Sequence, residues 1–280
     1  MALKDNRRQS TLLKEHPEFI FRIEERPQFT DDLANVDISS TELLIRGKTK
    51  NIERLKSFSN LIKLWIYTVN QKEFDAILNL VNPKMLHIYE MRVEDLSVIS
   101  SLTNLEVLGL EWNTKAKSLW DLSNNTYLKS LSIKDFSKLN DINPLQNKKS
   151  LEILILSGGV CNTLKLNSLE PLRFLSDLKY LGLTNIKVLD ESLEPISFIK
   201  GLQKLEVSNQ FLTEEYARIS INLPNTKCIL FQPYIYLTSP IDDKDVMVVG
   251  KRKPFLNSKV DVKRLQKYEE QFKEFQRKFR

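Results

Sequence analysis

The chain has 280 residues, of which 41% are hydrophobic and 28% charged, and its formal net charge is +6. A chain of this length and apolar content can bury a substantial core, which excludes a disordered protein. The charged amino terminus leads into no apolar stretch long enough for a signal peptide, and no segment approaches the roughly 18 apolar residues of a membrane span. We therefore expect a cytoplasmic protein with no membrane span.

The two cysteines, Cys161 and Cys228, are not arranged as CxxC. Cytosolic chains seldom hold disulfides, so both residues are predicted to be buried as small apolar side chains. No redox or zinc chemistry follows from them.

The chain is internally repetitive. The spacing apolar-x-x-apolar-x-apolar recurs, and its middle residues are 22, 22, 23, 23, 27 and 24 residues apart. A recurrence at this length is the signature of a solenoid, in which each unit is stabilised by stacking on its neighbours. An incomplete first unit contains Leu43 and Ile45, and the middle residues of the others are Leu64, Leu86, Leu108, Leu131, Leu154, Leu181 and Leu205.

A second apolar pair supports the same phase. Apolar residues occur twelve and nine positions before the middle residue in all seven complete units. In three units a proline lies between the two: Pro144, Pro171 and Pro195. Proline at this point suits the first turn of a short helix or a 3₁₀ turn on the convex side.

The segment from Asp95 to Asn113 resembles the roughly 22-residue units of internalin-like and phosphatase-regulator-like leucine-rich repeats. The resemblance implies an α/β fold, a leucine-rich repeat solenoid with a parallel concave sheet, short helical turns on the convex side, and a protein-binding role. The family's asparagine, whose amide bonds neighbouring turns, corresponds to Asn113 but is replaced by Phe136, Gly159 and Ile186 in later units. We expect the amide ladder to be broken there.

Three regions are expected. Residues 1–38, with the polar and aromatic segment Phe19–Ile23, are predicted to cap the first unit, and residues 39–225 to form about eight repeats. Residues 226–280 are predicted to form a C-terminal cap and a basic amphipathic helix. The cover of the last unit is expected at residues 217–233, through Ile219, Ile221, Ile229, Leu230 and Phe231.

Side chains between the core leucines should project from the concave sheet, because side chains alternate along a strand. Aromatic residues gather at one end of this face, and aromatic residues are enriched at the centres of protein interfaces. The alternative is that these rings pack on one another or against a terminal segment folded into the groove. The predicted partner-binding residues are Trp65, Tyr67, Met85, His87, Tyr89, Glu111, Trp112, Ile153, Ile155 and Tyr180.

Residues 251–280 contain 11 Lys and Arg against 4 Asp and Glu, a net charge of +7, so the first 250 residues sum to −1. In this tail, apolar residues recur at steps of three and four, which predicts an amphipathic helix. The helix could dock as an extension of the cap, bind a partner or a second copy, or contact nucleic acid or an anionic membrane. The stripe is Leu265, Tyr268, Phe272, Phe275 and Phe279, and the possible phosphate contacts are Lys251, Arg252 and Lys253.

No catalytic motif is found. The two histidines, His16 and His87, have no metal-ligand spacing, and no GxSxG, HExxH or phosphate-binding loop occurs. We expect a non-enzymatic scaffold, monomeric, without a cofactor or metal, that binds an unidentified partner protein. The alternative function is association with nucleic acid or another anionic surface through the basic tail.

Overall fold

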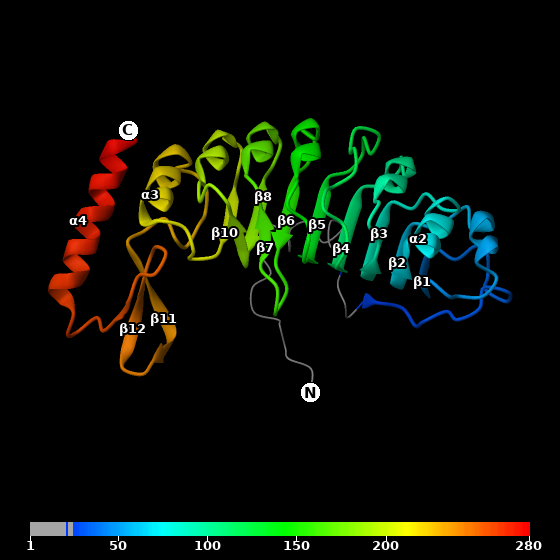
Figure 1. The fold of residues 1–280 in the computed structure, drawn as a ribbon, viewed down its shortest axis with the longest axis horizontal. Coiled ribbons are helices and arrows are strands. Elements are labelled where there is room, and N and C mark those ends of the chain that lie inside the picture. Colours follow the sequence, from blue (N-terminus) through cyan, green and yellow to red (C-terminus); the bar gives the residue numbers. More distant parts are fainter. Residues whose placement is uncertain (1–20, 22–24) are drawn as a thin grey trace.

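The computed structural model describes Phe21 and residues 25–280. Most of the predicted N-terminal cap, including all but Phe21 of the segment Phe19–Ile23, lies outside these residues. The described chain forms an arch with the repeats stacked along its length (Figure 1). Within this part, no helix is both long and apolar enough to cross a bilayer. The cytoplasmic location stays a prediction.

One parallel sheet of eight strands lines the concave side of the arch, in the order β1-β2-β3-β4-β5-β6-β8-β10. The middle leucines pair in register from strand to strand, as in Leu64 with Leu86 and Leu86 with Leu108. The predicted period therefore gives the observed register. The strands are β1 (Glu42–Arg46), β2 (Lys63–Asn70), β3 (Met85–Arg92), β4 (Val107–Asn113), β5 (Ser130–Phe136), β6 (Ile153–Ser157), β8 (Tyr180–Thr184) and β10 (Lys204–Val207).

Short helices form the convex side, and the three prolines lie in the first turns of η5, η6 and η7, as predicted. The second unit has a longer helix, α2 (Gln71–Leu78), because Asn70 and Glu73 form a reciprocal capping box at its start. The 3₁₀ helices are η3 (Ile52–Ser57), η4 (Ser97–Ser101), η5 (Asn143–Asn147), η6 (Glu170–Phe174) and η7 (Glu194–Phe198).

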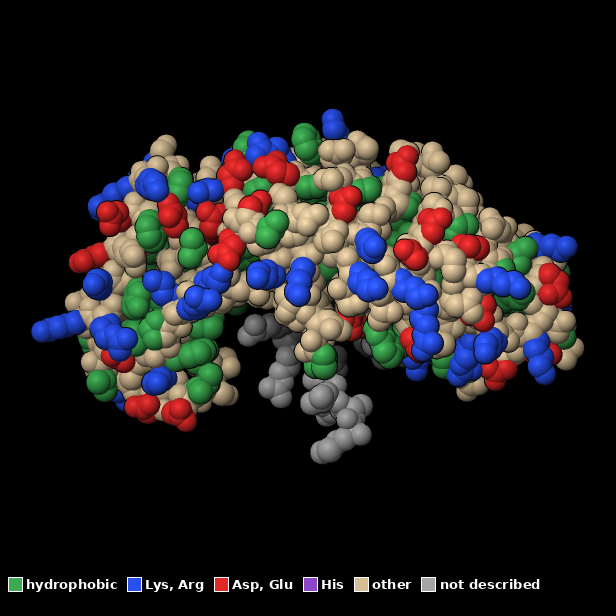
Figure 2. Space-filling model, in the orientation of Figure 1, with side chains coloured by type: hydrophobic (Ala, Val, Ile, Leu, Met, Phe, Trp, Pro, Cys, Tyr) green, Lys and Arg blue, Asp and Glu red, His purple; other side chains and the backbone are tan. Residues whose placement is uncertain are grey.

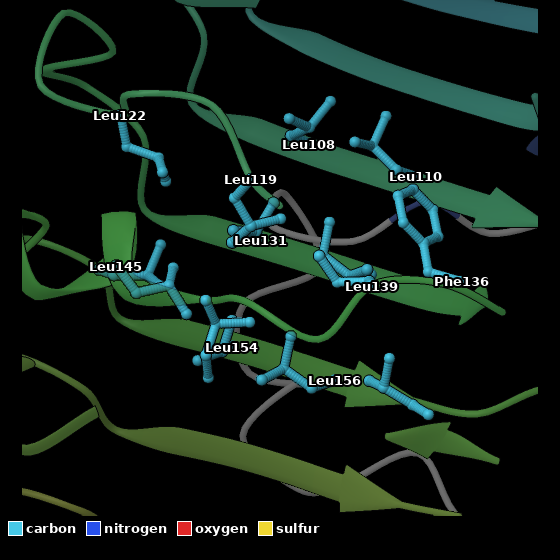
Figure 3. Packing of buried hydrophobic residues seen from close by; sticks show 14 of the residues in the cluster. Leu108, Leu110, Leu119, Leu122, Leu131, Phe136, Leu139, Leu145, Leu154 and Leu156 are labelled. Carbon is cyan, nitrogen blue, oxygen red and sulfur yellow. The ribbon is translucent and has the colours of Figure 1, made fainter. Parts of the chain in front are cut away.

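The core is one continuous stack of apolar side chains between sheet and convex turns (Figure 3). Leu119 and Leu122 are buried although their segment is not helical, so the apolar pair rather than the helix is the constant feature of each unit. Full burial of a leucine stabilises the fold by about 1.5–3 kcal/mol.

In five units a residue with a left-handed φ lies within two residues of the end of the strand, and the side chain that follows it is buried in the core. The position that holds the family's asparagine is this following residue, and it is buried whichever residue occupies it, as at Asn113, Phe136 and Ile186. The left-handed residues are Thr68, Glu90, Trp112, Asp135 and Asn185, with φ between 48° and 61°.

The amide ladder is interrupted in part, as expected. Asn113 is fully buried and donates to the Val93 carbonyl while accepting from the amides of Lys115 and Ala116. Phe136 fills the same position with a buried ring and makes no polar link. Two units later the amide link between neighbouring turns is made by the residue before this position, because the side chain of Asn185 donates to the Gly159 carbonyl at 2.7 Å.

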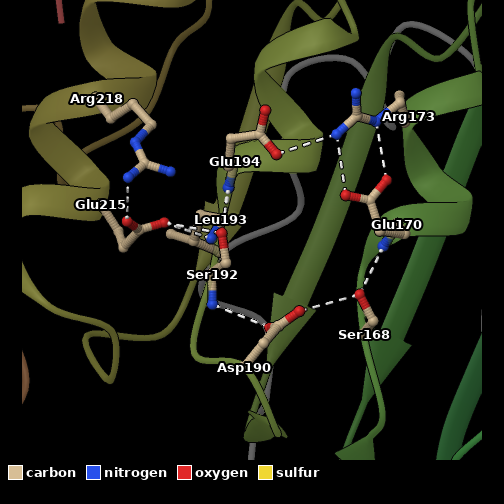
Figure 4. Close-up of polar contacts among 9 residues, drawn as sticks. All are labelled: Ser168, Glu170, Arg173, Asp190, Ser192, Leu193, Glu194, Glu215 and Arg218. Carbon is tan, nitrogen blue, oxygen red and sulfur yellow. Dashed lines mark hydrogen bonds and ion pairs between the residues drawn. The ribbon is translucent and has the colours of Figure 1, made fainter.

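Polar side chains join the last units on the convex side (Figure 4). Arg173 bonds Glu170 within its own unit and Glu194 in the next. Glu215 accepts from the Leu193 amide at 2.6 Å and pairs with Arg218 at 3.1 Å, so the cap helix is tied to the final repeat.

The C-terminal cap begins with α3 (Thr213–Asn222), where Tyr216 is buried and donates to the Ser208 carbonyl at 2.6 Å. Ile219 and Leu230 are buried as predicted, whereas Ile229 is 57% exposed and does not contribute to the core. A small antiparallel sheet that the sequence did not predict follows, formed by β11 (Tyr234–Ile241), β12 (Lys244–Val248) and β13 (Phe255–Leu256).

The basic tail forms α4 (Val262–Lys278), which lies beside α3 at the end of the arch (Figure 1). Phe272 joins the main core, and Leu265 packs with Val246, Val248 and Leu256 of the small sheet. Of the three readings of the tail, the structure has the docked one, with the apolar stripe used as an extension of the cap.

The cysteine prediction is wrong for Cys161, which is exposed. Cys161 lies in the loop between β6 and β7 (Leu164–Leu166), which accounts for the long interval of 27 residues in this unit. This loop leads to a second, two-stranded parallel sheet, in which β7 pairs with β9 (Ile186–Val188). Cys228 is half-buried, and burial raises the pKa of its thiol to about 11.

Candidate functional site

The sheet register brings the predicted aromatic residues together on the concave face. Trp65 lies in register with His87 and Gly109, and Tyr67 with Tyr89 and Glu111. We call Trp65, Tyr67, His87, Tyr89 and Trp112 the aromatic cluster. Its ring centroids are 5.2 Å apart for Trp65 and His87, 5.2 Å for Tyr67 and Tyr89, and 5.7 Å for Tyr89 and Trp112.

The aromatic cluster is not open along its whole length. Trp65 is 0% exposed, and its indole nitrogen donates to Glu42 at 2.7 Å. The Phe21 ring packs edge-on against Trp65 at 4.7 Å and against His87 at 5.3 Å. The expectation that Trp65 belongs to an exposed patch is therefore wrong, because a residue of the N-terminal segment packs on it.

Two further residues of the same segment lie on the next ring. Phe29 packs edge-on against Tyr67 at 5.4 Å. The Arg26 guanidinium donates to the Tyr67 hydroxyl at 2.9 Å and lies 5.2 Å from the centre of its ring. The Arg46 guanidinium also lies over the Phe29 ring, 3.6 Å from its centre. At this end, the predicted alternative of a terminal segment folded onto the rings describes the geometry.

His87 is nearly enclosed, and Gly109 makes room for it, because a Cβ at Gly109 would lie 2.9 Å from the histidine ring. Its Nε2 lies 3.8 Å from a Glu111 oxygen, which is longer than a hydrogen bond. His87 and, more weakly, Lys134 lower the pKa of Glu111 against the opposing effect of burial. Nδ1 of His87 is buried without a hydrogen-bond partner among the described atoms.

The exposed part of the concave face begins at Trp112, whose side chain is 41% exposed. The floor of the concave surface beyond it is low, because small residues alternate with the core leucines, as at Ser132 and Gly182. Ile155 is half-buried in the middle of this floor, while its neighbour Ile153 is buried.

Tyr180 ends the floor. It is 3% exposed and donates to Glu206 at 2.6 Å. Burial, then the hydrogen bond to Glu206, raises the pKa of the Tyr180 hydroxyl well above its usual value, so it stays a donor. Met85, at the other end, is half-buried beside the aromatic cluster.

The three predicted phosphate contacts differ in their surroundings. Lys251 pairs with Glu191, and the Lys253 ammonium lies 5.4 Å from the Tyr268 ring centre. Arg252 is exposed, with φ of 59°, and together with Lys251 it lowers the pKa of the Glu191 carboxylate. The expectation of a phosphate contact at these residues stays a prediction.

Three residues that sequence reasoning missed, Phe21, Arg26 and Phe29, contribute to the site. Their part of the chain was predicted to cap the first unit, and a terminal segment folded into the groove was given as an alternative, but these three residues were not singled out. Among the described residues, no group of three or more His, Cys, Asp or Glu could hold a metal ion.

Comparison with solved structures places the fold among leucine-rich repeat proteins. A leucine-rich repeat protein of Leptospira interrogans matches 61% of this chain and 43% of its own length, at 19% identity and a TM-score of 0.51. Two internalins of Listeria monocytogenes, InlF and InlC2, match 68% and 64% of this chain, at 23% and 20% identity and TM-scores of 0.44 and 0.42. The matched regions cover 59% of InlF and 73% of InlC2.

No protein-family model matches the chain, and no curated protein matches it by sequence. This chain spans less than half of the Leptospira protein. The parallel sheet and the match to the Leptospira protein confirm the predicted fold, a leucine-rich repeat solenoid.

Proposed function

We propose that this chain is a non-enzymatic, monomeric scaffold that binds a partner protein through its concave face. The observation that carries the proposal is Trp112, a large aromatic side chain 41% exposed at the open end of a row of packed rings. Large aromatic residues dominate the energy of protein interfaces, and an exposed one beside a low floor offers an anchor.

The proposed interface runs from Trp112 to Tyr180, with Glu111 and Ile155 between them. The covered end of the aromatic cluster supports this placement, because Phe21 and Phe29 pack edge-on against the rings of Trp65 and Tyr67. The rings at that end thus form a rigid wall beside the interface rather than part of its contact area.

The experiment is affinity capture from the native cell extract, with nuclease present throughout. The intact chain is compared with Trp112→Ala/Ile155→Ala and with a convex control, Tyr127→Ala/Phe174→Ala, whose side chains are 63% and 47% exposed. One protein retained by the intact chain and the control but lost with the concave variant is the expected result. Equal capture by all three chains, or loss with the control alone, contradicts the proposal.

A further inference from the structure

Cationic side chains gather on one flank of the arch, at the turns that follow the carboxyl ends of the strands. We call this set the basic flank: Arg92, Lys115, Lys117, Lys138, Lys165 and Lys187. All six are exposed. A line of lysine and arginine side chains crosses the visible face of the arch in Figure 2.

Backbone hydrogen bonds link each of these turns to the next, so the turns are stacked at the spacing of the strands, and we call each turn a rung. The Asn140 amide donates to the Lys117 carbonyl, and the Asn167 amide to the Asn140 carbonyl. Lys165 and Lys187 lie directly in register in the β7–β9 pair. Since the five rungs from Arg92 to Lys187 are about 4.8 Å apart, the basic flank extends over roughly 20 Å.

No member of the basic flank has a side-chain hydrogen bond or ion pair with any described residue, although such pairs are common elsewhere on the same sheet. At the amino ends of the strands, five lysines pair with glutamates at 2.5–3.4 Å, a set we call the paired flank. Its lysines are Lys63, Lys84, Lys129, Lys179 and Lys204.

The difference between the flanks points to an external anion. Like charges held side by side at strand spacing repel each other, and the fold gains nothing from that arrangement. Lys165 and Lys187 nevertheless face outward between buried neighbours on both strands. An elongated anion lying along the rungs would relieve this repulsion.

A nucleic-acid backbone fits the basic flank better than an acidic protein does. Protein interfaces are depleted in lysine, whereas phosphate contacts are made by it. An exposed aromatic ring lies next to the row, since Trp112 precedes Lys115 by three residues and is 41% exposed. Basic grooves with adjacent aromatic side chains bind single strands, because bases stack on the rings while phosphates meet the cations.

We propose that the basic flank, with Trp112 at its margin, binds single-stranded nucleic acid without sequence preference. This activity goes beyond the proposed protein scaffold. It places the contact mainly on the repeats, although Lys187 at one end of the row lines the same pocket as Lys251 and Arg252 of the tail.

The test is fluorescence anisotropy with labelled oligo-dT and oligo-rU of about 20 nucleotides at low salt, with labelled poly-glutamate as the competing class of anion. The basic-flank variant is Lys115→Gln/Lys138→Gln/Lys165→Gln/Lys187→Gln. The control, Lys84→Gln/Lys129→Gln/Lys179→Gln/Lys204→Gln, removes the same charge from the paired flank. Circular dichroism confirms that both variants remain folded.

We expect the basic-flank variant to lose affinity for both oligonucleotides on the order of 100-fold, and the control to change it only a few-fold. Trp112→Ala should weaken binding about tenfold, and Tyr127→Ala should leave it unchanged. Equal losses in the two quadruple variants would show a net-charge effect and overturn the proposal. So would an absence of binding, or tighter binding of poly-glutamate that ignores Trp112.

Discussion

The two flanks of the sheet carry the same residue type in opposite electrostatic settings. On the paired flank, Glu152 accepts from Lys179 at 2.5 Å and lies 3.3 Å from Lys129, so one carboxylate joins three neighbouring strands. On the basic flank, Lys165 and Lys187 lie side by side with no side-chain hydrogen bond or ion pair among the described residues, although Lys187 attracts the Glu191 carboxylate. Charges that serve the fold are neutralised locally, and unpaired charges in a row indicate a role outside it.

Both flanks rest on one core, which gives the largest expected effect. Phe136 is 1% exposed beneath the basic flank, two residues before Lys138. Phe136→Ala should lower the free energy of unfolding by about 3–5 kcal/mol, because it leaves a cavity where the ring was. Urea denaturation measures this. A change below about 1 kcal/mol would show that the rungs are not anchored in the core.

Asn113 gives the next effect, since it fixes the turn that carries Lys115. Asn113→Ala leaves the Val93 carbonyl and the amides of Lys115 and Ala116 without their partner. We expect a loss of about 1–3 kcal/mol in the free energy of unfolding. Asn140→Ala, an exposed asparagine on the next rung, is the control and should be close to neutral. Equal losses from the two changes would refute a special role for the buried amide.

Glu152→Gln tests the paired flank. Hydrogen bonds from Lys179 and Lys129 lower the pKa of Glu152, although burial opposes them. A lowered folded-state pKa stabilises the fold above the unfolded value, and this contribution is lost as the pH falls through the folded pKa. The variant should be less stable than the parent by about 0.2–1 kcal/mol at pH 7 and no less stable near pH 3. A difference independent of pH would contradict the ion-pair account.

The smallest expected effect is on the urea midpoint, which should change in opposite directions when one lysine is removed from each flank. Lys204→Gln removes an ion pair with Glu206 of 2.8 Å and should lower the urea midpoint slightly. Lys187→Gln relieves repulsion with Lys165 and should leave the midpoint unchanged or raise it slightly. If Lys187→Gln is the more destabilising of the two, the charge on the basic flank has a structural role that the contacts do not reveal.

The sequence predicted the repeat, the strand register, the convex turns and the C-terminal helix, because each depends on a local period of apolar residues. It did not predict that Phe21 covers Trp65, since that contact joins residues 44 positions apart in sequence and no pattern links them. The β11–β13 sheet was also missed, and its strands carry no marked alternation of apolar and polar residues.

The basic flank escaped prediction for a different reason. Its lysines occupy unequal positions within their units, and the extra residues after β6 bring Lys165 opposite Lys187. The charge total was also misleading, since the first 250 residues sum to −1 although six of their cations gather on the basic flank. Net charge shows how much charge a chain has, and only the fold shows where it gathers.

The measurement that tests the account most directly is the salt dependence of oligo-dT binding. Six phosphate contacts on a single strand predict a slope of about −4 in a plot of log affinity against log salt concentration. Removing four lysines of the basic flank should reduce the slope to about −1, whereas the paired-flank variant should keep the parent slope. An unchanged slope in the basic-flank variant would contradict the central claim that these unpaired cations meet the phosphates.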